Sequence, residues 1–247
     1  MRRLIVPTLL LLLILGGCLG EPGSPGAEAE APAPPAPSIL LAGCTGAGMT
    51  WEISPTWASE QLDDRFTPRL DDGGATLGLY VLSCPRTEVD GAAAGTAAYA
   101  TWWIPVEPTG PAPSAQEYQW HLAQVHAEAG PFSAWWQARG IPVTFGTVDA
   151  EPVQGPAGTG SLHVGDREGE VDATLAGGPP GTFQRDVVFA AEGVPYLTGW
   201  DDAAAILSGA TVETAGTTWH ARAQAGEIPS QAYTIEALDA GLQAPVG

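Results

Sequence analysis

The stretch TLGLYVLS, residues 76–83, decides the class of fold. It is a short, almost continuous apolar run that ends at Cys84-Pro85, a turn signal. Such a run, bounded by a breaker, is typical of a buried β-strand. The segment GTAAYATWWIPV, residues 95–106, has the same character. The chain is therefore expected to be built around a buried sheet.

A helical region is expected in the middle of the chain. The residues Ser114-Ala115-Gln116-Glu117 follow a proline breaker and form a capping box, which predicts the start of a helix. An apolar stripe then runs along one face of that helix, at Tyr118, Leu122, Val125 and Ala129. A second helical piece is predicted from Phe132 to Arg139, and Gly140 ends it.

After Gly140 the apolar pattern alternates with a period of two, which predicts strands separated by glycine or proline. The expected strands are residues 141–150, 161–165, 168–175, 182–190, 211–214 and 217–223, the last two forming a hairpin. Residues 230–241 fit a helix or a strand equally well. Strands on both sides of one helical region predict an α+β fold with a mainly antiparallel sheet.

The N-terminus has the pattern of an export signal. Two arginines precede an apolar run from Leu4 to Leu15. The residues Leu15-Gly16-Gly17-Cys18 resemble the lipobox of bacterial and archaeal lipoproteins, and this resemblance implies cleavage before Cys18 and lipid attachment to its thiol. The alternative is an uncleaved membrane anchor.

This pattern divides the chain into three parts. Residues 1–17 are the expected lipoprotein signal peptide, residues 18–37 the lipidated cysteine and a tether rich in Pro and Glu, and residues 38–247 a single extracytoplasmic domain. Prolines and repelling charges keep such a tether extended. The protein is thus expected at the outer face of the cell membrane, with the membrane as a partner through the lipid anchor.

The charge balance excludes several classes of protein. The formal net charge is −19, and all 9 basic residues are arginine. Nucleic acid is not expected as a partner, because no basic surface could neutralise phosphates. A chain without lysine cannot form a lysine Schiff base.

Two cysteines remain after Cys18. The domain that is expected to be exported then has an even number of cysteines, Cys44 and Cys84, which predicts a disulfide between them. Two buried free thiols are the alternative.

The candidates for catalysis lie on the expected central helix. Glu117, His121 and Glu128 would share one flank of it, and a carboxylate–imidazole–carboxylate row can act in acid–base chemistry. The alternative is an ordinary solvated flank. His163 and His220 fall in expected strands, where a hydrogen-bonded or surface histidine is favoured over a shared site. Neither a metal site nor a cofactor is expected, because the sequence has no zinc-type histidine spacing and no cofactor motif, although such a carboxylate–imidazole row could also hold a divalent ion.

Tryptophan is unusually abundant, with 9 residues. Adjacent residues of a strand point to opposite faces, so some members of the pairs Trp102-Trp103 and Trp135-Trp136 are expected at the surface or in a cavity. Exposed aromatic side chains can bind sugars and other flat ligands. The alternative role of these four residues is core packing.

Four short motifs carry a resemblance to a known family. They are RFTP at residues 65–68, LYVL with Cys84-Pro85 at residues 79–85, IPV at residues 104–106 and GIPV at residues 140–143. Together they resemble the acetoacetate-decarboxylase-like fold over roughly residues 60–240. Those decarboxylases use a Schiff-base lysine, and this chain has none. The resemblance therefore implies the fold and a ligand cavity but not the reaction.

These observations favour a non-catalytic binding domain for a small molecule, a glycan or an envelope partner. An enzyme with a carboxylate and histidine site, without lysine chemistry, is the first alternative. A structural envelope protein is the second.

Overall fold

The computed structural model describes residues 38–62, 64, 66–108, 119–155, 157–178, 180–183, 187–191, 194–216, 219 and 231–243. The expected signal peptide, Cys18, the tether and Glu117 lie outside these residues, as does His220. None of the helices in the described part is both long and apolar enough to cross a membrane.

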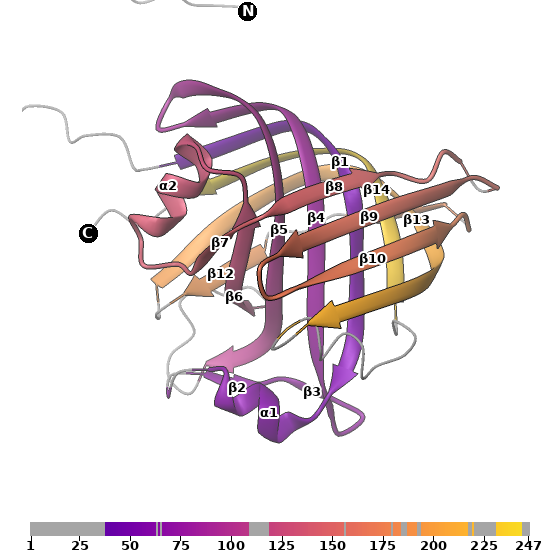
Figure 1. Ribbon diagram of the computed structural model, residues 1–247. Coiled ribbons are helices and arrows are strands. Elements are labelled where there is room, and N and C mark those ends of the chain that lie inside the picture. Colours follow the sequence, from indigo (N-terminus) through magenta and orange to yellow (C-terminus); the bar gives the residue numbers. More distant parts are fainter. Residues whose placement is uncertain are drawn as a thin grey trace, which may run out of the picture. The chain divides into compact units, whose positions relative to one another are not determined.

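Strands make up most of the described chain (Figure 1). The first half contains β1 (Ser38–Ile53), α1 (Pro55–Glu60), β2 (Phe66–Pro68), β3 (Leu70–Asp71), β4 (Gly74–Val89), β5 (Ala92–Pro108) and β6 (Gln119–Ala127). The second half contains α2 (Pro131–Gln137), β7 (Val143–Phe145), β8 (Thr147–Glu151), β9 (Thr159–Asp166), β10 (Gly169–Ala176), β11 (Pro180–Phe183), β12 (Val187–Ala191), β13 (Val194–Gly216) and β14 (Gln231–Gln243).

The strands form one hydrogen-bonded sheet in the order β12-β6-β5-β4-β1-β14-β13-β10-β9-β8. Strand β12 pairs with β13 as well as with β6, so the path from β12 to β13 closes on itself. Only the C-terminal part of β13, residues 209–216, pairs with β10. The long strand β13 therefore joins the closed ring to a second layer made of β10, β9 and β8. Because most pairings are antiparallel, the predicted mainly antiparallel sheet is confirmed.

The central helix predicted from Ser114 is wrong for residues 119–127, which form β6. Strand β6 pairs with β5 over eight positions and shifts register once, beside Trp102 and Trp103. That irregularity places Leu122 and Val125 in the core together, a spacing that also fits one face of a helix. Pairing with a long neighbouring strand has overridden the local helical pattern.

Three of the other predicted elements are confirmed. The buried strands expected at residues 76–83 and 95–106 lie inside β4 and β5, and the second helical piece is α2. The ambiguous residues 230–241 lie mostly in strand β14. Residues 211–214 are a strand, but they pair with β10, and the other arm of the predicted hairpin lies outside the described residues apart from Trp219.

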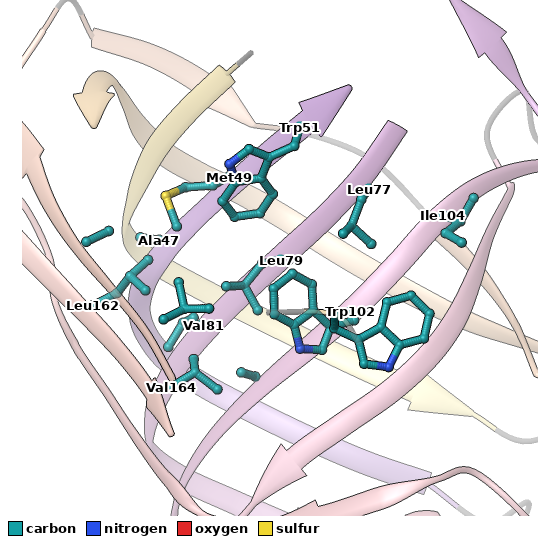
Figure 2. Packing of buried hydrophobic residues seen from close by; sticks show 14 of the residues in the cluster. Ala47, Met49, Trp51, Leu77, Leu79, Val81, Trp102, Ile104, Leu162 and Val164 are labelled. Carbon is teal, nitrogen blue, oxygen red and sulfur yellow. The ribbon is translucent and has the colours of Figure 1, made fainter. Parts of the chain in front are cut away.

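Two apolar clusters fill the two faces of the central strands. On β4, Leu77, Leu79 and Val81 point into one cluster, whereas Tyr80 and Leu82 point into the other. Figure 2 shows the first cluster, in which Leu162 and Val164 of β9 cover residues of β1, β4 and β5. The aromatic residues of α2 belong to the second cluster. Burial on both faces explains why the sequence of β4 is apolar at nearly every position.

The predicted disulfide between Cys44 and Cys84 is confirmed. It joins the neighbouring strands β1 and β4, whose register is the same on both sides of the bond, at Ala42–Arg86 and at Thr45–Ser83, so that the two cysteines lie opposite each other. Both cysteines are buried in the cluster that also contains Tyr80.

Candidate functional site

The structure does not bring the sequence-based catalytic candidates together. His121 lies on strand β6 next to Phe66, with the ring centroids 5.9 Å apart. Glu128 is exposed just beyond the end of that strand, seven residues further along. A strand extends about 3.3 Å per residue, so the two side chains are too far apart to share a site. The shared helix flank on which this hypothesis depended does not exist.

The four candidate tryptophans are buried rather than exposed. Trp102 and Trp103 do point to opposite faces of β5, as the sequence requires, but each face is covered by one of the two clusters. Trp103 stacks on Trp120 with the ring centroids 4.1 Å apart. On α2, Trp135 and Trp136 pack edge to face within the same cluster. The structure therefore places these residues in the core.

A buried group of three polar side chains, Trp102, His126 and Asp166, links two layers of the fold. Trp102 Nε1 donates to His126 Nε2 over 3.1 Å. An indole N–H can only donate, so Nε2 carries a lone pair and the proton of the neutral ring is on Nδ1. His126 Nδ1 lies 3.0 Å from Asp166 Oδ2, and both side chains are only 1% exposed. This group connects β5 and β6 to the hairpin of β9 and β10.

A second histidine, His163, is hydrogen-bonded at both ring nitrogens on the surface of the second layer, which is made of β8, β9 and β10. His163 Nδ1 lies 2.8 Å from Asp172 Oδ1, and His163 Nε2 lies 2.9 Å from Thr147 Oγ1. An ionised carboxylate only accepts, so the proton of the neutral ring is on Nδ1 and the hydroxyl of Thr147 donates to Nε2. A hydroxyl, an imidazole and a carboxylate in this order form the arrangement of a hydrolytic triad.

The register of strands β8, β9 and β10 explains why His163 contacts Asp172 and Thr147. Asp172 of β10 and Asp149 of β8 lie directly opposite His163, one on each side. Thr147 lies opposite Gly165, two residues after His163 on the same face of β9. A Cβ at Gly165 would lie 2.9 Å from His163 Nε2 and 3.2 Å from Thr147 Oγ1. The missing side chain therefore leaves the space in which the ring reaches the hydroxyl.

Thr147 and His163 lie at a surface hollow of about 640 Å³. Its lining includes Thr147, His163, Gly165 and the turn between β9 and β10, which contributes Asp166, Arg167 and Glu168. Small residues at 165 and 215, opposite Glu170 on either side, also line the hollow. Asp172 is not part of the lining, and it holds the ring nitrogen that faces away from Thr147.

Neither histidine lies in a metal-binding group. Within the described residues, no set of three or more His, Cys, Asp or Glu side chains is arranged to hold a metal ion. The side chains that line the hollow supply an imidazole, a hydroxyl group and carboxylates.

The structure is similar to solved enzymes of one fold. An acetoacetate decarboxylase from Legionella pneumophila matches with a TM-score of 0.58 and 14% identity over 89% of this chain and 94% of that one. The enduracididine biosynthesis enzyme MppR matches with a TM-score of 0.57 and 16% identity, over 90% and 91% of the two chains.

An acetoacetate-decarboxylase-like enzyme from Sphingomonas wittichii RW1 gives a TM-score of 0.56 and 10% identity, over 85% of this chain and 90% of that one. The fold is acetoacetate-decarboxylase-like. No family model matches the chain, and no curated protein sequence matches it either.

The comparisons correct the functional expectation drawn from the sequence. A non-catalytic binding domain, and a chain that is not an enzyme, were favoured there. The similar solved structures are enzymes, so those expectations are wrong for this fold. The alternative of an enzyme with a carboxylate and histidine site agrees better with them.

Sequence reasoning missed Thr147, Gly165 and Asp172. The alternating pattern of β8, β9 and β10 places each of them on the exposed face, which the sequence does indicate. Their proximity depends on the strand register, which one sequence does not reveal.

Proposed function

We propose that the chain is an exported enzyme that uses a histidine–carboxylate pair for hydrolysis, without lysine chemistry. The observation that carries this proposal is the position of His163, which is bonded to Asp172 at one ring nitrogen and to Thr147 at the other. The similarity in fold to known enzymes supports a catalytic role but does not define the reaction.

His163 is suited to act as a general base. Asp172 holds the proton on Nδ1, so the lone pair of Nε2 faces the hollow and can take a proton from a hydroxyl group. The side chain of His163 is 36% exposed, which leaves this nitrogen accessible to a substrate. General base catalysis by a positioned histidine typically gives about 10²- to 10⁴-fold in rate.

Imine chemistry is not part of this proposal. A decarboxylase that forms an imine needs a neutral amine, and all 9 basic residues of this chain are arginine. The guanidinium of arginine stays protonated at any usable pH and is not a nucleophile.

The proposed location is the outer face of the cell membrane, with a lipid on Cys18. The lipobox-like residues 15–18 support this location, and a disulfide in the domain is typical of an oxidising compartment. Replacing Cys18 with Ser should move the protein from the detergent phase to the aqueous phase in Triton X-114. A processed variant that still partitions into detergent would contradict lipidation at this position.

The catalytic proposal is tested with a panel of uncharged p-nitrophenyl esters and anilides and the full-length protein in mild detergent. The variant His163→Gln should lose most of the hydrolysis. Ser161→Ala is a matched control, because Ser161 is exposed on the same face of the same strand and outside the hollow. Equal activity of His163→Gln and the wild type, or no hydrolysis of any member of the panel, would refute the proposal.

A further inference from the structure

We propose that Thr147 is the nucleophile at this site and forms a covalent acyl intermediate with carboxylic esters that carry no negative charge. This inference rests on the proposed function and goes one step further. General base catalysis by His163 could instead activate a water molecule, so the role of Thr147 is a separate claim.

The geometry points to the hydroxyl of Thr147 as the group that His163 activates. Its Oγ1 lies 2.9 Å from Nε2, a normal distance for an O–H···N hydrogen bond. The competing acceptor is the carbonyl oxygen of Gly165, at 3.4 Å. Thr147 is exposed and lines the hollow, so an ester can approach the hydroxyl from solvent. Nucleophile, base and orienting carboxylate follow one another within hydrogen-bond distance.

Acylation follows from this arrangement. The Oγ1 atom of Thr147 attacks the ester carbonyl carbon while Nε2 of His163 takes the hydroxyl proton. The bond from the carbonyl carbon to the alcohol oxygen then breaks, and Nε2 gives its proton to the departing oxygen. The products of this half-reaction are a free alcohol and acyl-Thr147. Asp172 stays ionised and stabilises the doubly protonated ring between these two transfers.

Deacylation repeats these steps with a water molecule as the nucleophile. Nε2 takes a proton from a water molecule, whose oxygen bonds to the acyl carbon. The bond between that carbon and Oγ1 breaks, and Nε2 returns the proton to Oγ1. A carboxylic acid is released and the site is restored without any other reactant.

The charges around the hollow select the substrate class. Glu168 and Glu170 line the hollow. Among its described lining residues the cationic side chain is that of Arg167, whose Nη2 lies 3.9 Å from Glu168 Oε1. An ester that carries a carboxylate would meet like charges at the entrance. Neutral or cationic esters are therefore expected to react faster than anionic ones.

The test uses p-nitrophenyl trimethylacetate, a neutral ester whose bulky acyl group slows the attack by water. The full-length protein in detergent is mixed with this ester, quenched in acid and analysed by intact mass and peptide mapping. One trimethylacetyl group should appear on Thr147, and Thr147→Ser should retain the adduct. Thr147→Val should lose the adduct and about 100-fold of the hydrolysis rate.

The variant Gly165→Ala gives a second test that leaves all three polar residues in place. The backbone at this position is open to any residue, but the new Cβ would displace the end of the His163 ring from Thr147. Acylation should fall at least tenfold while the melting temperature changes little. Unchanged acylation in Gly165→Ala would contradict the proposed geometry.

The outcomes separate this inference from the proposed function. Hydrolysis that needs His163 but leaves no adduct, and that survives in Thr147→Val, would mean that His163 activates water, which overturns this inference alone. No hydrolysis and no adduct would overturn both. Replacing the neutral p-nitrophenyl acetate by the anionic p-nitrophenyl hemisuccinate should lower the rate of hydrolysis at least tenfold, and Glu170→Gln should reduce this difference. Equal rates for the two esters would contradict the assigned substrate class.

Discussion

His126 Nδ1 lies 3.0 Å from Asp166 Oδ2, and the two side chains are almost completely buried. The other carboxylate oxygen of Asp166 accepts hydrogen bonds from the backbone N–H groups of Glu168 and Gly169, at 2.6 Å and 3.1 Å. One buried carboxylate therefore closes the turn between β9 and β10 and also ties that hairpin to β6. The same hairpin carries His163 and Asp172, so this contact holds the candidate site against the rest of the fold.

Removing this contact should destabilise the protein strongly. Asp166→Ala removes the carboxylate that lies beside the buried His126 ring and leaves two backbone N–H groups without their acceptor, and the loss in free energy of unfolding should be about 3 kcal/mol. Urea unfolding followed by tryptophan fluorescence measures it. Asp149→Ala, an exposed aspartate on β8, is the control and should change the stability by less than about 0.5 kcal/mol.

A double-mutant cycle shows whether the effect comes from the pair itself. His126→Ala and Asp166→Ala should be non-additive, with a coupling energy of about 1 kcal/mol or more. Fully additive effects would mean that the two side chains act independently, contrary to the structure.

Reduction of the disulfide between Cys44 and Cys84 should lower the stability. The bond closes a loop with a sequence separation of 40, and the chain-entropy model gives about 4 kcal/mol for a loop of this length. The urea midpoint with and without a reducing agent measures the change. Two thiols that react with Ellman's reagent in the denatured, unreduced exported protein would contradict the bond.

Tyr99 should make the stability fall at alkaline pH. Burial raises the pKa of its phenol above the usual value. The unfolded chain ionises near pH 10, whereas the folded chain keeps the proton, so stability is retained below pH 10 and lost above it. The loss from this residue should approach about 1.4 kcal/mol per pH unit. Tyr99→Phe should flatten the decline in urea midpoint between pH 10 and 11 and should have no such effect near pH 7.

The sequence predicts the positions of the strands better than it predicts which strands pair and in which register. The apolar run at residues 76–83 is readable as a buried strand because both faces of β4 are covered. Residues 119–127 are misread as a helix because a register shift against β5 gives Leu122 and Val125 a helical spacing. The tryptophan pairs are misread as partly exposed because a single sequence does not reveal that both faces of β5 are covered.

The candidate site is predictable only in part, for the same reason. His163 is visible in the sequence as a histidine in a strand. Its partners come from β8 and β10, and the register of those strands decides that Asp172 and Thr147 reach the ring. A shift of one residue would turn these side chains toward the core.

The measurement that tests the central claim most directly compares Asp172→Asn with Asp149→Asn in ester hydrolysis. Both aspartates are exposed and lie directly opposite His163 on neighbouring strands, and both substitutions remove one negative charge, but the hydrogen bond to the ring comes from Asp172. Asp172→Asn should lower kcat about 10- to 100-fold with little change in KM or melting temperature, because the amide favours the wrong tautomer of the ring. Asp149→Asn should stay within about twofold of the wild type. Equal losses in the two variants, or full activity of Asp172→Asn, would contradict catalysis by the His163–Asp172 pair.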